Sequence, residues 1–502
     1  MSRTATVRER PRRRPLPDDR GTAEVTEFVA TERDAVYPRQ PIRQRSDHET
    51  TPMSQPHEPP LTERPTKIRY GVLTFLCVLV FILYVDRICI AQAVTKIEEE
   101  LKIEDDQMTW VLMAFTLSYS LFEVPMGWWG DKYGSRGVLT RIVIWWSAFT
   151  ALTGAARGLV SLVVIRFLFG AGEAGALPNS ACILSRWYPV ERRGMAQGAI
   201  NSAMLIGGAV APIVTAYLIK TIGWRWSFGV LSLPGVVWAI AFWWWYRDDP
   251  QVHPSVNEQE RQLILAGTTS KSGEHPAIPW RAVLTHPQVW MLGFILACSA
   301  FNSYLYFSWY PTYLKKARGC DEIDAGWLAS IVLAGGAIGC LSGGCIIDWL
   351  TRKTGDRFRC RRYLCSSSVL LASVSLLIGK HCDTPVIATL WTAGSLMLTV
   401  VTLASWWGSV SDLSGRHLGA LFGLMNSLGG LGALASQSFA GNFATWMKSQ
   451  GHTGRAQWDP MFYVYSGVLF AGATTWLFID ARRSVEDARA ARLQAANDLH
   501  AG

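Results

Sequence analysis

Long apolar runs follow one another along the chain from Tyr70 onward, and short polar segments separate them. Each run is about 20 residues long, the length that an α-helix needs to cross the hydrocarbon core of a bilayer. The runs lie near residues 69–93, 109–130, 137–156, 159–185, 196–219, 225–246, 288–313, 324–349, 362–380, 386–410, 419–445 and 460–480. The pattern predicts an all-α polytopic membrane protein with twelve transmembrane helices in two six-helix halves.

The polar segments divide the chain into five predicted parts. Residues 1–67 are rich in Arg and Pro and contain no apolar run, so we expect a disordered basic tail in the cytoplasm. An Arg cluster at 12–14 could indicate a twin-arginine export signal, but no apolar stretch follows it closely, which favours the tail. The remaining parts are a first half, a central cytoplasmic loop, a second half and a cytoplasmic tail, at 68–247, 248–286, 287–481 and 482–502.

The distribution of charged residues among the loops indicates the topology. The chain is 49% hydrophobic and only 17% charged, yet its formal net charge is +9. Basic residues gather in alternate loops, as at 132–141 and 352–362, whereas the opposite loop at 98–106 is acidic. By the positive-inside bias, we expect both termini to be cytoplasmic in a multi-pass inner-membrane protein. The excess charge therefore does not indicate a nucleic-acid partner.

The ten cysteines do not form a pattern typical of metal ligands, and most lie in or beside apolar runs. We therefore predict no metal site. Cys320 and Cys382 both fall in loops that we place outside the membrane, so a disulfide bond between them is left open.

Two short motifs recur in the second half. Gly127-x-x-x-Asp131 returns as Gly344-x-x-x-Asp348, 217 residues later, and the Asn-Ser pair at Asn201 returns at Asn426, 225 residues later. Two parallel repeats of six helices are the arrangement of major-facilitator transporters. The segment from Gly127 to Arg136 also resembles the signature loop of that superfamily. The resemblance implies a gating role for Gly127, Asp131 and Arg136, while a static loop contact is the alternative.

Further motifs make the chain similar to the anion:cation symporter family of that superfamily. They include Tyr84-Val-Asp86-Arg87, the segment from Arg166 to Gly175, and Trp407-x-x-x-Ser411-Asp412. The similarity extends over residues 67–482 and implies transport of a sugar acid such as galactonate, glucarate or a hexuronate. It also implies a cavity role for Tyr119. Met204 replaces a polar side chain of galactonate-type members, so the resemblance does not name one sugar acid.

Four ionisable residues lie deep in the predicted spans, where an unpaired charge costs several kcal/mol. They are Asp86, Arg87, Arg166 and Glu173. Arg166 and Glu173 are seven residues apart and therefore share one helix face, as do Tyr84 and Arg87, three apart. Two guanidinium groups and two carboxylates balance to zero. We expect these residues to face a cavity or one another.

The chemistry of these residues fits proton-coupled anion transport. The planar fork of Arg87 matches a substrate carboxylate. Asp86 and Glu173 are the predicted proton carriers, and the resemblance implies that Arg166 pairs with a carboxylate. A buried ion-pair network that only holds helices together is the alternative.

The second half offers neutral polar side chains instead. Amide, hydroxyl and indole groups suit a polyhydroxylated chain. We predict substrate contacts from Trp407 and Asn426, together with Tyr84 and Tyr119 of the first half. Further polar candidates are Asn302, Ser303, Tyr304, Tyr306, Ser405 and Trp406.

Signatures of other activities are missing from the sequence: it has no phosphate-binding loop, no HExxH motif and no GxSxG motif. We therefore expect no enzyme and no cofactor, with the proton gradient as energy source. The predicted protein is a monomeric symporter that imports a hexonate, hexarate or hexuronate together with protons across the bilayer. The alternatives are a carrier of another organic anion or phosphate, and a membrane sensor that binds a sugar acid without moving it.

Overall fold

The computed structural model describes residues 64–266, 280–414, 418–480 and 482. Within these ranges the chain is almost wholly helical and contains no strand, as the apolar pattern predicted. Seven helices are long and apolar enough to cross a membrane by length and composition alone, and others are shorter or less apolar. The predicted tails, apart from residues 64–67 and 482, lie outside the described residues.

Six helices make up the first half. They are α1 (Ile68–Leu101), α2 (Asp105–Tyr133), α3 (Ser135–Thr153), α4 (Leu159–Glu173), α5 (Ala176–Trp187) and α6 (Val190–Trp245). The fourth predicted span is divided into α4 and α5, whereas the fifth and sixth are continuous in α6. Gly223, at φ 78° and ψ 160°, breaks α6 where the turn between these two spans was expected. Only glycine adopts such a backbone conformation without steric cost.

The central loop carries short helices, namely η1 (Pro250–Val252), α7 (Glu258–Ala266) and α8 (Trp280–Leu284). Glu260 of α7 is fully buried, and its carboxylate accepts hydrogen bonds from the backbone N–H groups of Ile68 and Arg69, each at 3.1 Å. The Arg69 side chain adds a salt bridge at 3.1 Å. A carboxylate at a helix N-terminus satisfies free N–H groups and complements the helix dipole. The loop is thereby fastened to the beginning of α1.

The second half contains the remaining elements. They are α9 (Pro287–Tyr304), the π-helical turn η2 (Leu305–Trp309), α10 (Tyr310–Lys316), α11 (Glu322–Thr354), α12 (Arg357–His381), α13 (Pro385–Val401), α14 (Leu403–Ser414), α15 (Leu418–Ser449), α16 (Arg455–Trp458) and α17 (Met461–Trp476). Cys320 and Cys382 are both free thiols, so the disulfide bond that was left open is not formed in this structure. Arg318 instead donates to the Cys382 carbonyl at 2.5 Å.

Glycines allow neighbouring helices to approach closely within each half. A Cβ atom at Gly207 of α6 would lie 2.6 Å from the Phe81 carbonyl oxygen of α1, and one at Gly432 of α15 would lie 2.2 Å from the Ala297 carbonyl oxygen of α9. Small residues at such contacts are typical of membrane helices, where packing must come from van der Waals contact.

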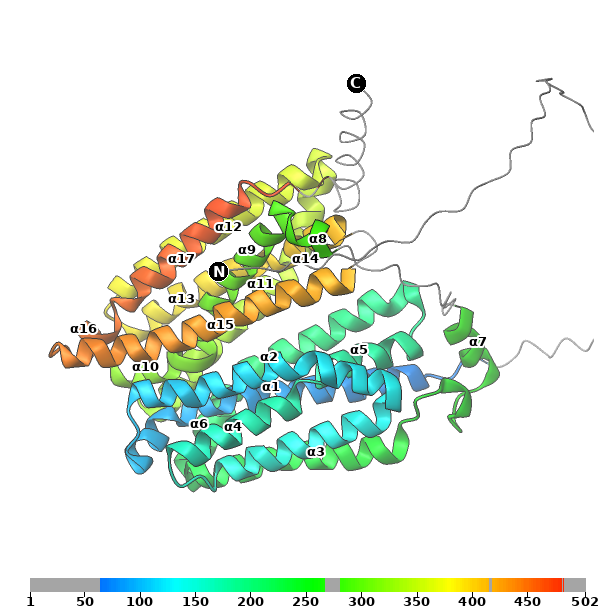
Figure 1. Cartoon of the computed structure of the whole chain (residues 1–502), viewed down its shortest axis with the longest axis horizontal. Helices are drawn as coiled ribbons and strands as arrows, with labels where there is room; N and C mark the ends of the chain where they lie inside the picture. The colour runs from blue at the N-terminus through cyan, green and yellow to red at the C-terminus, as the bar shows by residue number, and fades with distance from the viewer. Residues whose placement is uncertain (1–63, 267–279, 415–417, 481, 483–502) are drawn as a thin grey trace, which may run out of the picture. The chain divides into compact units, whose positions relative to one another are not determined.

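The helices of the two halves group separately, and α2 and α15 lie next to each other between the groups (Figure 1). We call the end of the bundle where α1 begins the terminal end, and the end where α1 finishes and α2 begins the distal end. The halves meet closely toward the distal end: a Cβ atom at Gly441 of α15 would lie 1.9 Å from Thr109 Oγ1 of α2. A Cβ atom at Gly326 of α11 would lie 2.7 Å from Ala216 Cβ of α6.

Candidate functional site

A buried ion pair joins α1 to α4. Arg87 Nε donates to Glu173 Oε1 at 2.7 Å, and Arg87 Nη2 contacts the same oxygen. The Glu173 side chain is 1% exposed and that of Arg87 is 13% exposed. The sequence predicted that these residues face a cavity or one another, and the structure shows that Arg87 and Glu173 are partners. Because both lie away from bulk water, loss of either charge would leave the other uncompensated.

Aromatic rings surround the Arg87 guanidinium. Its central carbon lies 4.6 Å from the ring centre of Tyr119 and 5.2 Å from those of Tyr84 and Phe115. Such rings stabilise a cation through their electron-rich faces. Two of the predicted substrate-binding residues, Tyr84 and Tyr119, therefore lie directly beside Arg87.

Arg166 does not pair with a carboxylate among the described residues, although the resemblance implied that it would. Its guanidinium carbon lies 4.4 Å from the Phe169 ring centre and 5.1 Å from that of Phe115. Its Nε atom is buried without a hydrogen-bond partner. No ion pair of Arg166 occurs among the described residues, because the bonded oxygen of Glu173 goes to Arg87. In this conformation Arg166 is held by ring contacts.

Asp86 lies next to Arg87 in α1 and is 1% exposed. Neither of its carboxylate oxygens accepts a hydrogen bond, and Glu173 Oε2 has no partner either. A buried carboxylate without donors is costly when ionised. Binding of a proton removes that cost, so the surroundings of both side chains favour uptake of protons.

Glu123 of α2 belongs to the same region and was not among the predicted residues. Asn426 Nδ2 of α15 donates to Glu123 Oε2 at 2.9 Å, which links the two halves. The site thus contains three carboxylates and two guanidinium groups, and the predicted balance of two against two is wrong. The rule that identified Asp86 also identifies this residue, because Glu123 stands in an apolar run between Phe122 and Val124.

The second-half candidates are spread over several contacts. Trp407 is 45% exposed and packs edge-to-face on Trp406, with ring centres 5.7 Å apart. Asn302 accepts a hydrogen bond from Tyr306 at 3.2 Å. Asn426 is the candidate that the structure brings to a charged group of the first half, through Glu123.

The predicted gating residues lie at the terminal end. Gly127 and Asp131 belong to α2, and the Asp131 side chain lies outside the part of the chain that the structure describes. The Arg136 backbone N–H donates to Asp248 Oδ1 at 3.0 Å, and its guanidinium carbon lies 4.5 Å from the Trp243 ring centre. Arg136 therefore ties the beginning of α3 to the end of α6, within the first half.

Ion pairs close the distal end between the halves, and the sequence did not reveal them. Lys316 Nζ of α10 lies 2.6 Å from Glu98 Oε2 of α1 and 2.7 Å from Asp105 Oδ1 of α2. We call these three residues the distal latch. The neighbouring Lys315 donates to the Gln92 carbonyl at 2.5 Å.

Deeper along α2, Gln437 of α15 adds a second link between the halves. Its Oε1 accepts from Thr116 at 2.9 Å, while its Nε2 donates to Ser308 at 3.0 Å. The bond between Asn426 and Glu123 lies further still from the distal end, since α2 and α15 run in opposite directions.

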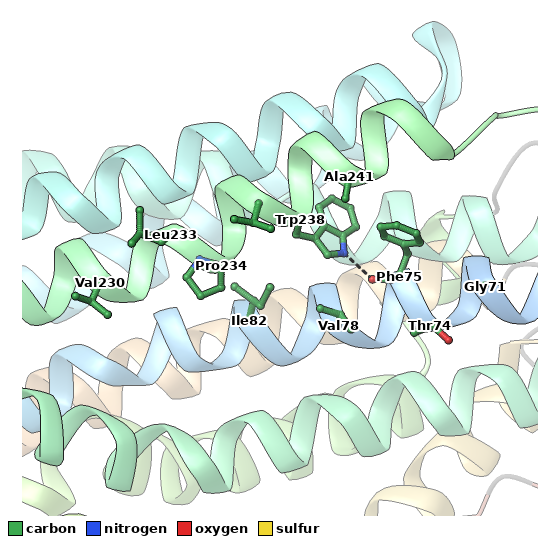
Figure 2. Close-up of a pocket in the computed structure, with 11 residues that line it drawn as sticks. Gly71, Thr74, Phe75, Val78, Ile82, Val230, Leu233, Pro234, Trp238 and Ala241 are labelled. Atoms are coloured by element: carbon green, nitrogen blue, oxygen red, sulfur yellow. Dashed lines mark hydrogen bonds between the residues drawn. The ribbon is translucent and has the colours of Figure 1, made fainter.

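An apolar groove elsewhere in the first half is a different feature. It has a volume of about 830 Å³ and lies between α1 and α6 (Figure 2). The residues that line it are Gly71, Thr74, Phe75, Val78, Ile82, Val230, Leu233, Pro234, Val237, Trp238 and Ala241. The Trp238 indole donates a hydrogen bond to the Phe75 carbonyl at 2.9 Å, which holds the two helices together. With no ionisable side chain in its lining, this groove cannot bind an acid selectively.

Comparison with known proteins places these features in a family. The sequence profile of the Major Facilitator Superfamily matches residues 76–437. A probable sulfoacetate transporter of Cupriavidus necator is 31% identical over 426 residues, which are 84% of this chain and 96% of that protein.

Two other relatives are named for sugar acids. The D-galactonate transporter of Escherichia coli is 27% identical over 83% of this chain and 96% of its own. A probable galactarate/D-glucarate transporter of Bacillus subtilis is 27% identical over 75% of this chain and 86% of its own. The resemblance to sugar-acid transporters noted in the sequence is confirmed by these matches.

Solved structures share the fold. A bacterial homologue of the human lysosomal transporter Spinster superposes with a TM-score of 0.68 at 19% identity, over 83% of this chain and 98% of that one. A D-xylose–proton symporter superposes with a TM-score of 0.63 at 15% identity, over the same shares. The predicted two-half transporter fold is confirmed.

Proposed function

Because the chain belongs to the Major Facilitator Superfamily, we propose that this multi-pass membrane transporter is a proton-coupled symporter for a sugar-acid anion. The substrate is a hexonate, hexarate or hexuronate, imported across the cytoplasmic membrane by alternating access. The observation that carries the proposal is the buried pair of Arg87 and Glu173. Its two members are a group that binds carboxylates and a group that binds protons.

The pair couples the two ligands through competition. While Glu173 is ionised, it occupies the Arg87 guanidinium. When Glu173 takes up a proton, it loses the charge that holds Arg87, and the planar fork becomes available to a substrate carboxylate. Substrate and proton are then bound together, which is the condition for symport. Asp86 directly precedes Arg87 in α1, and its carboxylate has no hydrogen-bond donor. It therefore provides a second site for a proton.

Transport also requires that access alternates between the two sides of the membrane. The positive-inside bias puts the terminal end in the cytoplasm, so the distal end faces outward. In the structure the distal latch joins the halves on that side. Substrate enters from outside after the latch opens, and it leaves on the terminal side after the latch forms again.

The names of the relatives support an organic anion as substrate. They include transporters of D-galactonate and of galactarate/D-glucarate. A second candidate, favoured by the relative named for sulfoacetate, is a smaller organic anion that carries a sulfonate. Arg87 suits either, since a guanidinium binds carboxylate and sulfonate oxygens alike.

The test is uptake into proteoliposomes under an imposed pH gradient, with a panel of sugar acids. We expect pH-driven accumulation by the wild type. Glu173→Gln should abolish that accumulation yet retain exchange of internal for external substrate, because the neutral side chain mimics the protonated state. Glu99→Gln, which removes a 66% exposed carboxylate from the same protein, is the matched control. Normal pH-driven accumulation by the Glu173 variant would refute the coupling role, and binding without any uptake would indicate a sensor.

A further inference from the structure

Glu123 has no part in the cycle described above, yet it faces the same space as Arg87. It lies one helical turn after Tyr119 on α2, so the two side chains share a face. The Tyr119 ring is 4.6 Å from the Arg87 guanidinium. Glu123 therefore lies about one helical turn along α2 from the point where Arg87 meets Tyr119.

The position of Glu123 is fixed by a contact with the second half. Asn426 donates to one of its oxygens at 2.9 Å, and the side chain is only half-buried. A carboxylate that has a donor and reaches solvent keeps its charge more easily than one without either. Asp86 has neither. Glu173 is ion-paired with Arg87 and takes up a proton in the proposed cycle, so Glu123 is the carboxylate of the site that the cycle leaves ionised.

A fixed negative group has two effects on a ligand whose acid end is bound at Arg87. It accepts hydrogen bonds from hydroxyl groups, because an ionised carboxylate is an acceptor only. It also repels a second anionic group, and like charges brought together in such a site cost several kcal/mol. One helical turn separates Tyr119 from Glu123, so the two ends of the site are roughly 5–10 Å apart, comparable to the chain of a sugar acid.

We propose that Glu123 is a specificity-determining residue that selects hydroxylated monoanions, such as hexonates and hexuronates, over dianions. This inference rests on the proposed function, and it narrows the substrate class of the same site. It depends on a different residue from the coupling pair and on a different property, the charge at the end of the substrate remote from Arg87.

The experiment measures proteoliposome uptake of three probes in wild-type protein and in Glu123→Gln. D-galactonate is a hydroxylated monoanion, D-glucarate is a hydroxylated dianion, and sulfoacetate is a dianion without hydroxyl groups. We expect the wild type to prefer galactonate. Glu123→Gln should raise the ratio of glucarate to galactonate uptake by about 10- to 100-fold, since the repulsion is removed. Glu123→Asp keeps the charge and should keep the wild-type ratio.

The outcomes separate this inference from the proposed function. Uptake by the wild type with an unchanged ratio in Glu123→Gln overturns the role of Glu123 and leaves symport intact. A wild type that prefers sulfoacetate or glucarate also overturns it. No pH-driven uptake of any probe by the wild type refutes the proposed function and the inference with it. If Glu123→Gln does not fold, Glu123→Ser removes the same charge, and the same ratio decides.

Discussion

Loss of the distal latch should open the protein at its distal end. Lys316→Gln removes a charge that lies 2.6 Å from Glu98 and 2.7 Å from Asp105. The two carboxylate side chains are 7% and 8% exposed, whereas Lys316 is 32% exposed. With the lysine replaced, the closed state keeps two neighbouring carboxylates away from water without the cation that pairs with both of them. Opening hydrates them, so the substitution penalises the closed state selectively.

The size of this penalty follows from the exposure of the three groups. Removing one partner of a fully buried ion pair costs about 3–5 kcal/mol, and an exposed pair contributes about 0–1 kcal/mol. The latch lies between these limits, because its carboxylates are buried and its ammonium group is partly hydrated. We take about 2 kcal/mol, which corresponds to roughly a 30-fold shift of the population toward a state that is open at the distal end.

Labelling of a thiol between the halves measures the shift. Ser120 is exposed on α2, and its Oγ would lie 3.0 Å from a Cβ atom at Gly430 of α15. Ser120→Cys, treated with a membrane-impermeant thiol reagent on the distal side, should react slowly when Lys316 is present. It should react faster, by up to about 30-fold, in Lys316→Gln. Peptide-resolved mass spectrometry separates this thiol from the 10 native cysteines.

Two control variants make the result decisive. Lys316→Arg keeps the charge and should restore slow labelling. Lys96→Gln breaks the exposed pair with Glu99, whose side chains are 47% and 66% exposed, and should leave the rate unchanged. A wild-type labelling rate in Lys316→Gln, or an equal increase in Lys96→Gln, would refute the latch.

Three further substitutions test other parts of the structure. Arg87→Lys should weaken substrate binding at least about tenfold, measured by titration calorimetry, because the guanidinium fork is lost; wild-type affinity would contradict its role. Glu260→Ala should lower the free energy of unfolding in detergent by about 3–5 kcal/mol, since Arg69 would keep a buried charge, and an unchanged denaturation midpoint would refute this. Gly441→Val should speed distal labelling like Lys316→Gln, because its Cβ would lie 1.9 Å from Thr109 Oγ1, whereas Gly467→Ala, with open space around it, should not.

The helices and the grouping into halves could be predicted from the sequence, because bilayer thickness sets the length of each apolar run. The break in α6 was placed near Gly223 for the same reason, as a short polar interruption between two runs. Helices α4 and α5 were expected as one span, and together they form one segment, Leu159–Trp187, that is long and apolar enough to cross a membrane. The interruption after Glu173 falls among small apolar residues, which give no change of hydropathy at that point.

The site was predicted in its residue types but not in its pairing. The cost of burying a charge identifies Asp86, Arg87, Arg166 and Glu173 from their depth in the spans. Which carboxylate pairs with which guanidinium depends on the rotation and tilt of two helices, and the spacing within one helix does not contain that information. Glu123 obeys the same rule and was overlooked, whereas the partners of Lys316 come from helices far apart in the sequence.

The contact between Glu260 and the beginning of α1 sets an order for assembly in the cell. Arg69 and Glu260 are 191 residues apart, so the carboxylate leaves the ribosome only after all six helices of the first half have been made. Until then the first N–H groups of α1 have no carboxylate to accept their hydrogen bonds, and the Arg69 charge has no partner there. The contact between the central loop and the beginning of α1 therefore forms only after the first half has been made.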